Sequence, residues 1–143
     1  LIRQEADIVT DTNMALAGIN KKELARYGGQ TYCFMADEAV VREAKERQLT
    51  RAAVSMEHAA QLEKPVVFVI GNAPTALISL YELMQKRKWR PAFVIGVPVG
   101  FVNVEAAKEL ILSTDVPHIV NRGRKGGSNV AAAIVNALLY DMI

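Results

Sequence analysis

A basic, glycine-rich segment, Arg122-Gly123-Arg124-Lys125-Gly126-Gly127-Ser128, has the residue types that point most directly to chemistry. Three cationic side chains lie next to glycines whose backbone N–H groups are easily reached, and the segment leads into a predicted helix. This combination favours binding of a carboxylate or a phosphate, although an ordinary solvated turn with glycine caps is the alternative. The segment lacks the spacing of a Walker phosphate loop, and no Gly-x-Gly-x-x-Gly dinucleotide fingerprint follows a predicted strand.

Three further segments carry groups that could contact a ligand. Gly96-Val97-Pro98-Val99-Gly100-Phe101-Val102 is apolar and could form a flat wall for a large planar ligand, or a turn packed into the core or a subunit interface. Gly71-Asn72-Ala73-Pro74-Thr75-Ala76 offers the hydrogen-bonding side chains of Asn72 and Thr75, with helix capping as the alternative. Asp11-Thr12-Asn13-Met14 follows a predicted strand, and it either faces a site or closes a turn.

Neither histidine has the sequence surroundings of a catalytic group. His58 falls within a predicted long helix, where a histidine is more often solvated than catalytic, and His118 starts a predicted strand. No spacing of His, Cys, Asp and Glu matches a metal site, and no Gly-x-Ser-x-Gly nucleophile motif is present. The residues alone therefore favour a ligand-binding surface built from loops, without a metal.

The elements that must position these loops follow from the apolar pattern. Short β-branched runs alternate with longer helical stretches, which is typical of an α/β protein. We expect one domain over residues 1–143, with a three-layer, doubly wound, mainly parallel sheet of about five strands in a Rossmann-like arrangement. The predicted strands are Asp7–Thr10, Thr31–Met35, Pro65–Ile70, Ala92–Val97 and His118–Val120. The predicted helices are Asp37–Leu62, Pro74–Trp89, Val104–Ser113 and Ser128–Asp141. Ligands of such sheets bind beyond the carboxyl ends of the strands, where these loops should meet.

Composition excludes several classes of protein. Of the 143 residues, 51% are hydrophobic, which is enough for a buried core and rules out a disordered chain. A formal net charge of +2 gives no general reason to expect nucleic acid or a membrane surface as a partner. No apolar stretch reaches the roughly 18 residues that a spanning helix needs. The single cysteine, Cys33, allows no internal disulfide, which fits a cytoplasmic protein.

Five segments, in this order and spacing, closely resemble the precorrin-8X methylmutase (precorrin isomerase) family. They are Asp11–Met14, Thr50-Arg51-Ala52-Ala53, Gly71–Leu77, Gly96–Val102 and Arg122–Ser128. The resemblance implies an isomerase of cobalamin biosynthesis that moves a methyl group from carbon 11 to carbon 12 of precorrin-8X, giving hydrogenobyrinate. With cobalt already inserted, the product is cobyrinate. The resemblance also implies a homodimer with sites near the subunit interface, and no cofactor.

The resemblance and the loop chemistry together select the residues expected to bind the substrate. A carboxylate-rich macrocycle requires cations, which the arginines supply, and its flat ring requires an apolar wall. The expected substrate-binding residues are Asp11, Thr12, Asn13, Met14, Arg51, Asn72, Thr75, Pro98, Val99, Gly100, Phe101, Val102, Arg122, Arg124, Gly126, Gly127 and Ser128.

The resemblance also sets what this chain is expected to lack. The catalytic histidine of the family lies in a helix that precedes all of these segments. We therefore expect the chain to be N-terminally incomplete, with that histidine upstream of Leu1 and no catalytic residue within the chain. Ala52 departs from the family, which commonly has Ser after the arginine. Two other functions stay open: a non-catalytic tetrapyrrole-binding homologue and, more distantly, a nucleotide-binding α/β module.

Overall fold

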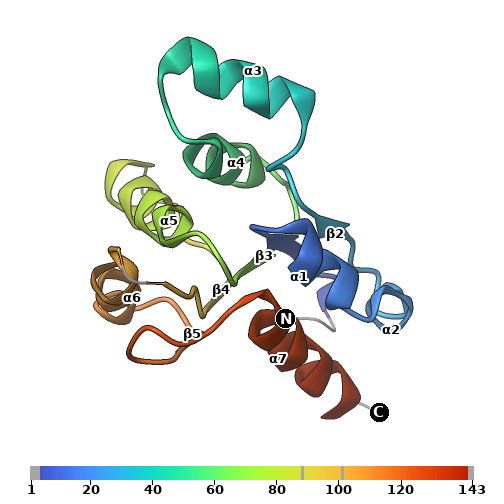
Figure 1. The fold of residues 1–143 in the computed structure, drawn as a ribbon. Helices are drawn as coiled ribbons and strands as arrows, with labels where there is room; N and C mark the ends of the chain where they lie inside the picture. The colour runs from blue at the N-terminus through green and yellow to red at the C-terminus, as the bar shows by residue number, and fades with distance from the viewer. Residues whose placement is uncertain (1–3, 88, 101, 142–143) are drawn as a thin grey trace.

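A single parallel sheet with helices on both faces forms the centre of the computed structural model, which describes residues 4–87, 89–100 and 102–141 (Figure 1). Its strands run in the order β2-β1-β3-β4-β5, and every neighbouring pair is parallel. The chain extends the sheet to one side of β1 with β2 and then to the other side with β3, so the order reverses between β1 and β3. The strands are β1 (Asp7–Thr10), β2 (Thr31–Tyr32), β3 (Val66–Ile70), β4 (Phe93–Gly96) and β5 (His118–Val120).

The helices form a layer on each face of the sheet, so the predicted three-layer α/β class is confirmed. On one face lie α4 (Arg51–Ala59), α5 (Pro74–Arg87) and α6 (Val104–Leu112), with α3 (Glu38–Arg47) packed outside α4. On the opposite face lies α7 (Ser128–Asp141), with α1 (Asn13–Gly18) beside it (Figure 1). The short α2 (Lys21–Ala25) contributes Leu24 to the core on this second face.

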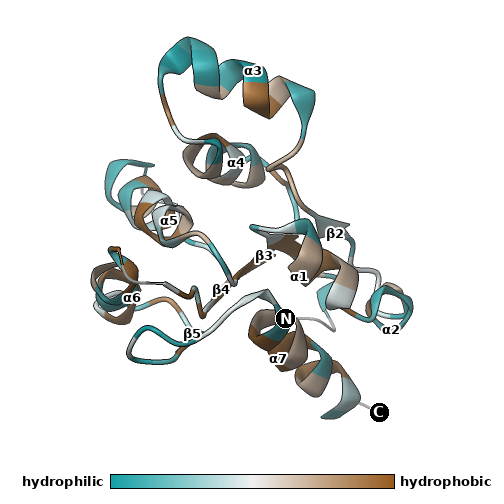
Figure 2. Cartoon of the chain, in the orientation of Figure 1, coloured by the Kyte–Doolittle hydropathy of each residue, from teal (hydrophilic) through white to brown (hydrophobic). Residues whose placement is uncertain are grey.

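Alternate residues of the central strands face the two helical layers. In β3, Phe68 packs in the layer of α4, α5 and α6, whereas Val67 and Val69 pack in the layer of α7. All five residues of β3 are buried, as a uniformly apolar run predicts for a strand covered on both faces. Figure 2 shows β3 and β4 in the hydrophobic colour and the outlying α3 mostly in the hydrophilic one. The site described below therefore rests on a rigid, doubly covered sheet.

The prediction of one long helix over Asp37–Leu62 is wrong. The structure has two helices there, because Gln48 adopts a left-handed backbone with φ of 54° at the end of α3. The Thr50 hydroxyl then accepts a hydrogen bond from the Ala53 N–H at 3.0 Å and starts α4. Apolar periodicity continues through both helices, so it does not reveal the break.

The remaining boundaries differ less. Two strands, β1 and β5, have the predicted bounds, but the predicted strand Thr31–Met35 pairs only through Thr31 and Tyr32. The other predicted strands and helices differ by at most two residues at an end. The short helices α1 and α2 were not predicted; the side chains of Thr12 and Asn20 cap their first turns. Within the described ranges, no helix is long and apolar enough to cross a membrane.

Candidate functional site

Four loops meet at one edge of the sheet because the strands are parallel. β1, β3, β4 and β5 all end at this edge, and each leads into one of the segments that the sequence singled out, 11–14, 71–76, 96–102 and 122–128 (Figure 1). The helix α4 runs back toward the start of β3, so its first residue, Arg51, also lies at this end. The topology thus gathers the predicted binding segments as expected.

Asp11 joins the first two of these loops. Its carboxylate accepts hydrogen bonds from the backbone N–H groups of Gly71, Asn72 and Ala73, at 2.9, 2.8 and 2.6 Å. Asp11 is only 1% exposed; burial raises the pKa of its carboxyl group, and the three N–H donors partly offset that shift. The carboxylate that the sequence offered for ligand contact is therefore occupied in shaping the loop that starts α5.

Thr12 and Ser128 join the first loop to the start of α7. Their hydroxyl oxygens lie 2.7 Å apart, and the Thr12 hydroxyl also accepts a hydrogen bond from the Ala15 N–H at 3.0 Å. The neighbouring side chains of Asn13 and Met14 are exposed. This junction brings together segments that are 116 residues apart in the chain.

The loop after β4 lies directly against the basic loop. The Gly127 N–H donates to the Val97 carbonyl at 2.9 Å, and the Gly100 N–H donates to the Arg124 carbonyl at 3.3 Å. Gly126 lies so close to this loop that an added Cβ would be 2.8 Å from the Val97 carbonyl carbon. Glycine is required there because the two backbones are in contact.

The apolar surface expected after β4 is present in part. Val99 and Val102 are 44% and 77% exposed, so their side chains are free to contact a flat ligand. Pro98 is buried and offers little surface to a ligand. Phe101, the largest apolar residue predicted for this wall, lies outside the described residues. A hydrophobic surface thus borders the basic loop.

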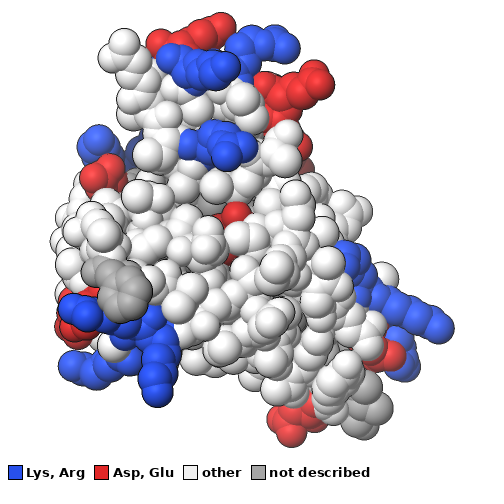
Figure 3. All heavy atoms as spheres, viewed as in Figure 1, with Lys and Arg blue, Asp and Glu red and all other residues white. Residues whose placement is uncertain are grey.

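The cations of the basic loop lie beside acidic residues of α6. Arg122 Nη1 is 3.6 Å from Glu109 Oε1, and Arg124 Nε is 3.1 Å from Glu105 Oε1. All four side chains are more than half exposed, so these ion pairs are weak and a carboxylate-bearing ligand could replace the glutamates. Figure 3 shows basic side chains gathered at the lower left, over the segment between β5 and α7.

Lys108 is a residue of the site region that sequence reasoning missed. It lies in α6, is 1% exposed, and its Nζ donates to the carbonyls of Gly123 and Lys125 at 2.7 and 3.0 Å. Burial lowers the pKa of its ammonium group. The available signal was its helical register, because Lys108 falls on the same face as the buried Val104 and Ile111.

The remaining predicted groups are solvent-accessible at the same end of the sheet. Arg51 is exposed, and its Nη1 reaches the Met35 carbonyl at 3.5 Å, just beyond β2. The side chains of Asn72 and Thr75 are exposed as well. α5 begins at Pro74, and the Asp11 carboxylate accepts from the backbone N–H groups of Asn72 and Ala73 just before it.

Both histidines lie at the other end of the molecule. His58 is in the last turn of α4, where its Nε2 is 3.2 Å from Glu43 Oε1 of α3. His118 starts β5, and its Nδ1 is 2.7 Å from the Val116 carbonyl oxygen. Among the described residues, no cluster of His, Cys, Asp and Glu could hold a metal ion. Neither histidine therefore lies at the loop edge.

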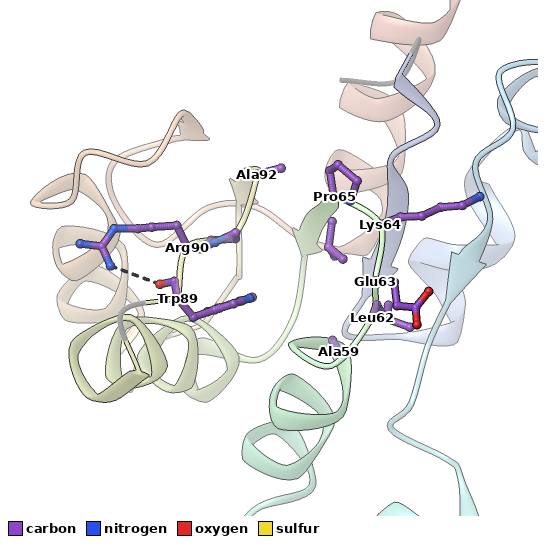
Figure 4. Close-up of a pocket in the computed structure, with 10 residues that line it drawn as sticks. Ala59, Leu62, Glu63, Lys64, Pro65, Trp89, Arg90 and Ala92 are labelled. Atoms are coloured by element: carbon purple, nitrogen blue, oxygen red, sulfur yellow. Dashed lines mark hydrogen bonds between the residues drawn. The ribbon is translucent and has the colours of Figure 1, made fainter.

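A hollow of about 310 Å³ lies at the opposite edge of the sheet, before β3 and β4 (Figure 4). Its two cationic residues bond to backbone carbonyls: Lys64 Nζ donates to the Gly28 carbonyl, and Arg90 donates to the carbonyls of Met84 and Trp89. Figure 4 shows the side chains of Lys64 and Arg90 extending away from each other. This hollow does not gather charged groups around one ligand position, unlike the loop edge.

Comparison with known proteins gives consistent matches over almost the whole chain. A family model described as precorrin-8X methylmutase matches residues 1–141. The cobalt-precorrin-8 methylmutase of Salmonella typhimurium is 48% identical over 142 residues, which cover 99% of this chain and 66% of that protein. The precorrin-8X methylmutase of Pseudomonas aeruginosa is 40% identical, over 93% of this chain and 64% of that protein.

Solved structures agree with these matches. The precorrin-8X methylmutase from Thermus thermophilus superposes with a TM-score of 0.86 at 36% identity, over 97% of this chain and 68% of that one. A precorrin-8X methylmutase related protein superposes with a TM-score of 0.89 at 32% identity, over 99% and 74%. The present chain spans slightly less than two thirds of the length of the curated relatives described above.

Proposed function

This chain belongs to the precorrin-8X methylmutase family, and on that premise we propose that it binds precorrin-8X or its cobalt-bearing form at the loop edge of the sheet. The reaction is the transfer of a methyl group from carbon 11 to carbon 12 of the macrocycle, a step of cobalamin biosynthesis. The substrate carboxylates bind the cations of the basic loop and Arg51, and the flat ring lies on the apolar surface formed by Val99 and Val102.

One observation carries this proposal: the basic loop and the apolar loop are bonded together at the end of the sheet. The Gly127 N–H to Val97 carbonyl bond and the Gly100 N–H to Arg124 carbonyl bond join the loop that carries the exposed Arg122 and Arg124 to the loop that carries the exposed Val99 and Val102. A tetrapyrrole with several carboxylates matches this surface, because its edge is anionic and its faces are apolar. A nucleotide also carries negative charge, but this edge lacks the phosphate-binding sequence patterns.

Positioning is the contribution that these residues make to the reaction. A sigmatropic methyl shift needs no nucleophile, so holding the macrocycle in the reactive conformation supplies much of the rate. The arginines fix the carboxylate edge, and the apolar loop covers part of the ring face. We assign none of the described residues the role of proton donor to the macrocycle.

Absorbance titration tests the proposal. Hydrogenobyrinic acid and cobyrinic acid are expected to give saturable spectral shifts with the folded chain, whereas ATP is expected to bind far more weakly. A folded sample that gives no shift with either corrinoid contradicts the proposed function. Tight binding of ATP would instead favour a nucleotide-binding module. Turnover of precorrin-8X by this chain would exclude a non-catalytic homologue and show that the histidine expected upstream of Leu1 is dispensable.

Replacing Arg124 with alanine is expected to weaken binding of hydrogenobyrinic acid by about 1.5–3 kcal/mol, because one charge-assisted contact to a carboxylate is lost. The dissociation constant from the same titration measures this. Arg87→Ala is the matched control, since it removes the same charge from the exposed end of α5. An unchanged dissociation constant for Arg124→Ala contradicts the contact with substrate.

We further propose a homodimer, supported by apolar side chains left uncovered on the α7 face. Val130, Leu138 and Tyr140 of α7 and Ile119 of the edge strand β5 are exposed. Uncovered apolar side chains gathered on one face are typical of an interaction surface. Sedimentation equilibrium is expected to give twice the chain mass of 15.7 kDa. A monomer at micromolar concentration contradicts this assembly.

A further inference from the structure

Lys108 is a lysine with only 1% of its surface exposed, so its amine is buried. Its Nζ lies under the basic loop and donates to two carbonyls of that loop, those of Gly123 and Lys125. Burying an amine is unfavourable, as the lowered pKa of Lys108 reflects, and an apolar residue on this face of α6 would avoid that penalty. The hydrogen bonds to these two carbonyls therefore offset the cost of burying the amine.

The effect of these bonds is to turn the oxygens of the basic loop toward the protein. The carbonyl oxygens of three successive residues accept hydrogen bonds from neighbouring segments. Those of Gly123 and Lys125 accept from Lys108 of α6, and that of Arg124 accepts from the Gly100 N–H. The Asn121 side-chain amide also donates to the Lys125 carbonyl, at 2.7 Å. Carbonyl lone pairs repel a carboxylate, so a loop whose carbonyls point inward presents a better surface to an anion.

The same helix aligns the cations of this loop. Glu105 and Glu109 are one helical turn apart on α6, and they lie beside Arg124 and Arg122 respectively. The glutamate pairs are exposed and exchangeable, whereas the Lys108 bonds are buried. The backbone of the loop is therefore more constrained than its arginine side chains, because Lys108 of α6 hydrogen-bonds to its carbonyls.

We propose that Lys108 is a positioning residue: its ammonium group holds residues 123–125 in the shape that binds the substrate carboxylates, without touching the substrate. The inference rests on the proposed function for the identity of the ligand, but the loop shape itself is independent of it. No covalent step involves Lys108.

The test compares Lys108→Met with Lys86→Met. Methionine keeps the length and apolar stem of the lysine but has no donor, and the control removes the same charge from an exposed position of α5. Two readouts are taken: the amide NMR signals of Gly123, Gly126 and Gly127 in the free protein, and the dissociation constant for hydrogenobyrinic acid. A role in stability alone would move neither readout in a sample that is fully folded.

Lys108→Met is expected to shift the three loop signals, leave the Gly18 signal unchanged, and raise the dissociation constant at least tenfold. Lys86→Met is expected to change neither readout. Unmoved loop signals, or a dissociation constant within twofold of the parent chain, overturn the inference. If the parent chain binds no corrinoid, the proposed function has failed, and the loop signals alone decide whether Lys108 shapes the loop.

A second variant decides the case in which Lys108→Met does not fold. Asn121→Ala removes another donor to the Lys125 carbonyl and leaves α6 intact. It is expected to shift the Gly126 signal and to raise the dissociation constant two- to fivefold. If Asn121→Ala leaves both readouts unchanged, the Asn121 bond does not shape the loop, because Lys108 still donates to the Lys125 carbonyl. Lys108→Gln, whose amide is too short to reach the Gly123 and Lys125 carbonyls, then decides the case: unmoved loop signals in that variant reject the inference.

Discussion

Gly126→Ala is expected to lower the free energy of unfolding by about 3–4 kcal/mol and to remove measurable corrinoid binding. The added Cβ would collide with the Val97 carbonyl oxygen and lie 2.9 Å from the Pro98 carbonyl oxygen. Both neighbours are backbone atoms, so no side-chain rotation relieves the contact. The basic loop must therefore separate from the loop after β4. Urea denaturation and the absorbance titration measure the two effects.

Gly123→Ala is the matched control for this clash. Gly123 also has a positive φ, of 91°, but an added Cβ there meets nothing within 4 Å. Only backbone strain is added, which costs about 1–2 kcal/mol. Equal losses in the two variants would show that loop strain, and not the contact between the loops, accounts for the effect.

Asp11→Ala is expected to lower the free energy of unfolding by about 3–4 kcal/mol, because three backbone N–H donors lose a shared acceptor. The donors at Gly71, Asn72 and Ala73 start α5, and Asp11 is almost fully buried, so water cannot easily take the place of the carboxylate. Urea denaturation measures the change. Asp11→Asn is expected to lose less, since the amide keeps one oxygen acceptor.

Asp37→Ala separates this effect from the loss of any carboxylate. Asp37 precedes α3 and is exposed, and its side chain makes no hydrogen bond to the helix N-terminus. The control is expected to change the free energy of unfolding by less than about 1 kcal/mol. If Asp11→Ala lost no more than this control, the three hydrogen bonds would not be what holds the β3–α5 loop.

The sequence predicted the strands that are buried on both faces, but it did not predict the helix boundary that depends on the backbone conformation of one residue. The uniformly apolar runs at β3 and β4 identify strands because only a doubly covered strand tolerates them. The left-handed Gln48 carries no such pattern, so the break between α3 and α4 was missed. The short β2 was overextended because its apolar neighbours, Phe34 and Met35, pack on the core without pairing.

The sequence by itself determined which loops belong together, since a parallel sheet places the ends of its strands at one edge and the residue types there favour a carboxylate-rich, flat ligand. Only the tertiary structure decided what each side chain does at that edge. The Asp11 carboxylate accepts hydrogen bonds from backbone N–H groups 60 to 62 residues away, and Lys108 of α6 donates to two carbonyls of the basic loop. The physical reason is that these hydrogen bonds join segments distant in the chain, and local spacing carries no record of such partners.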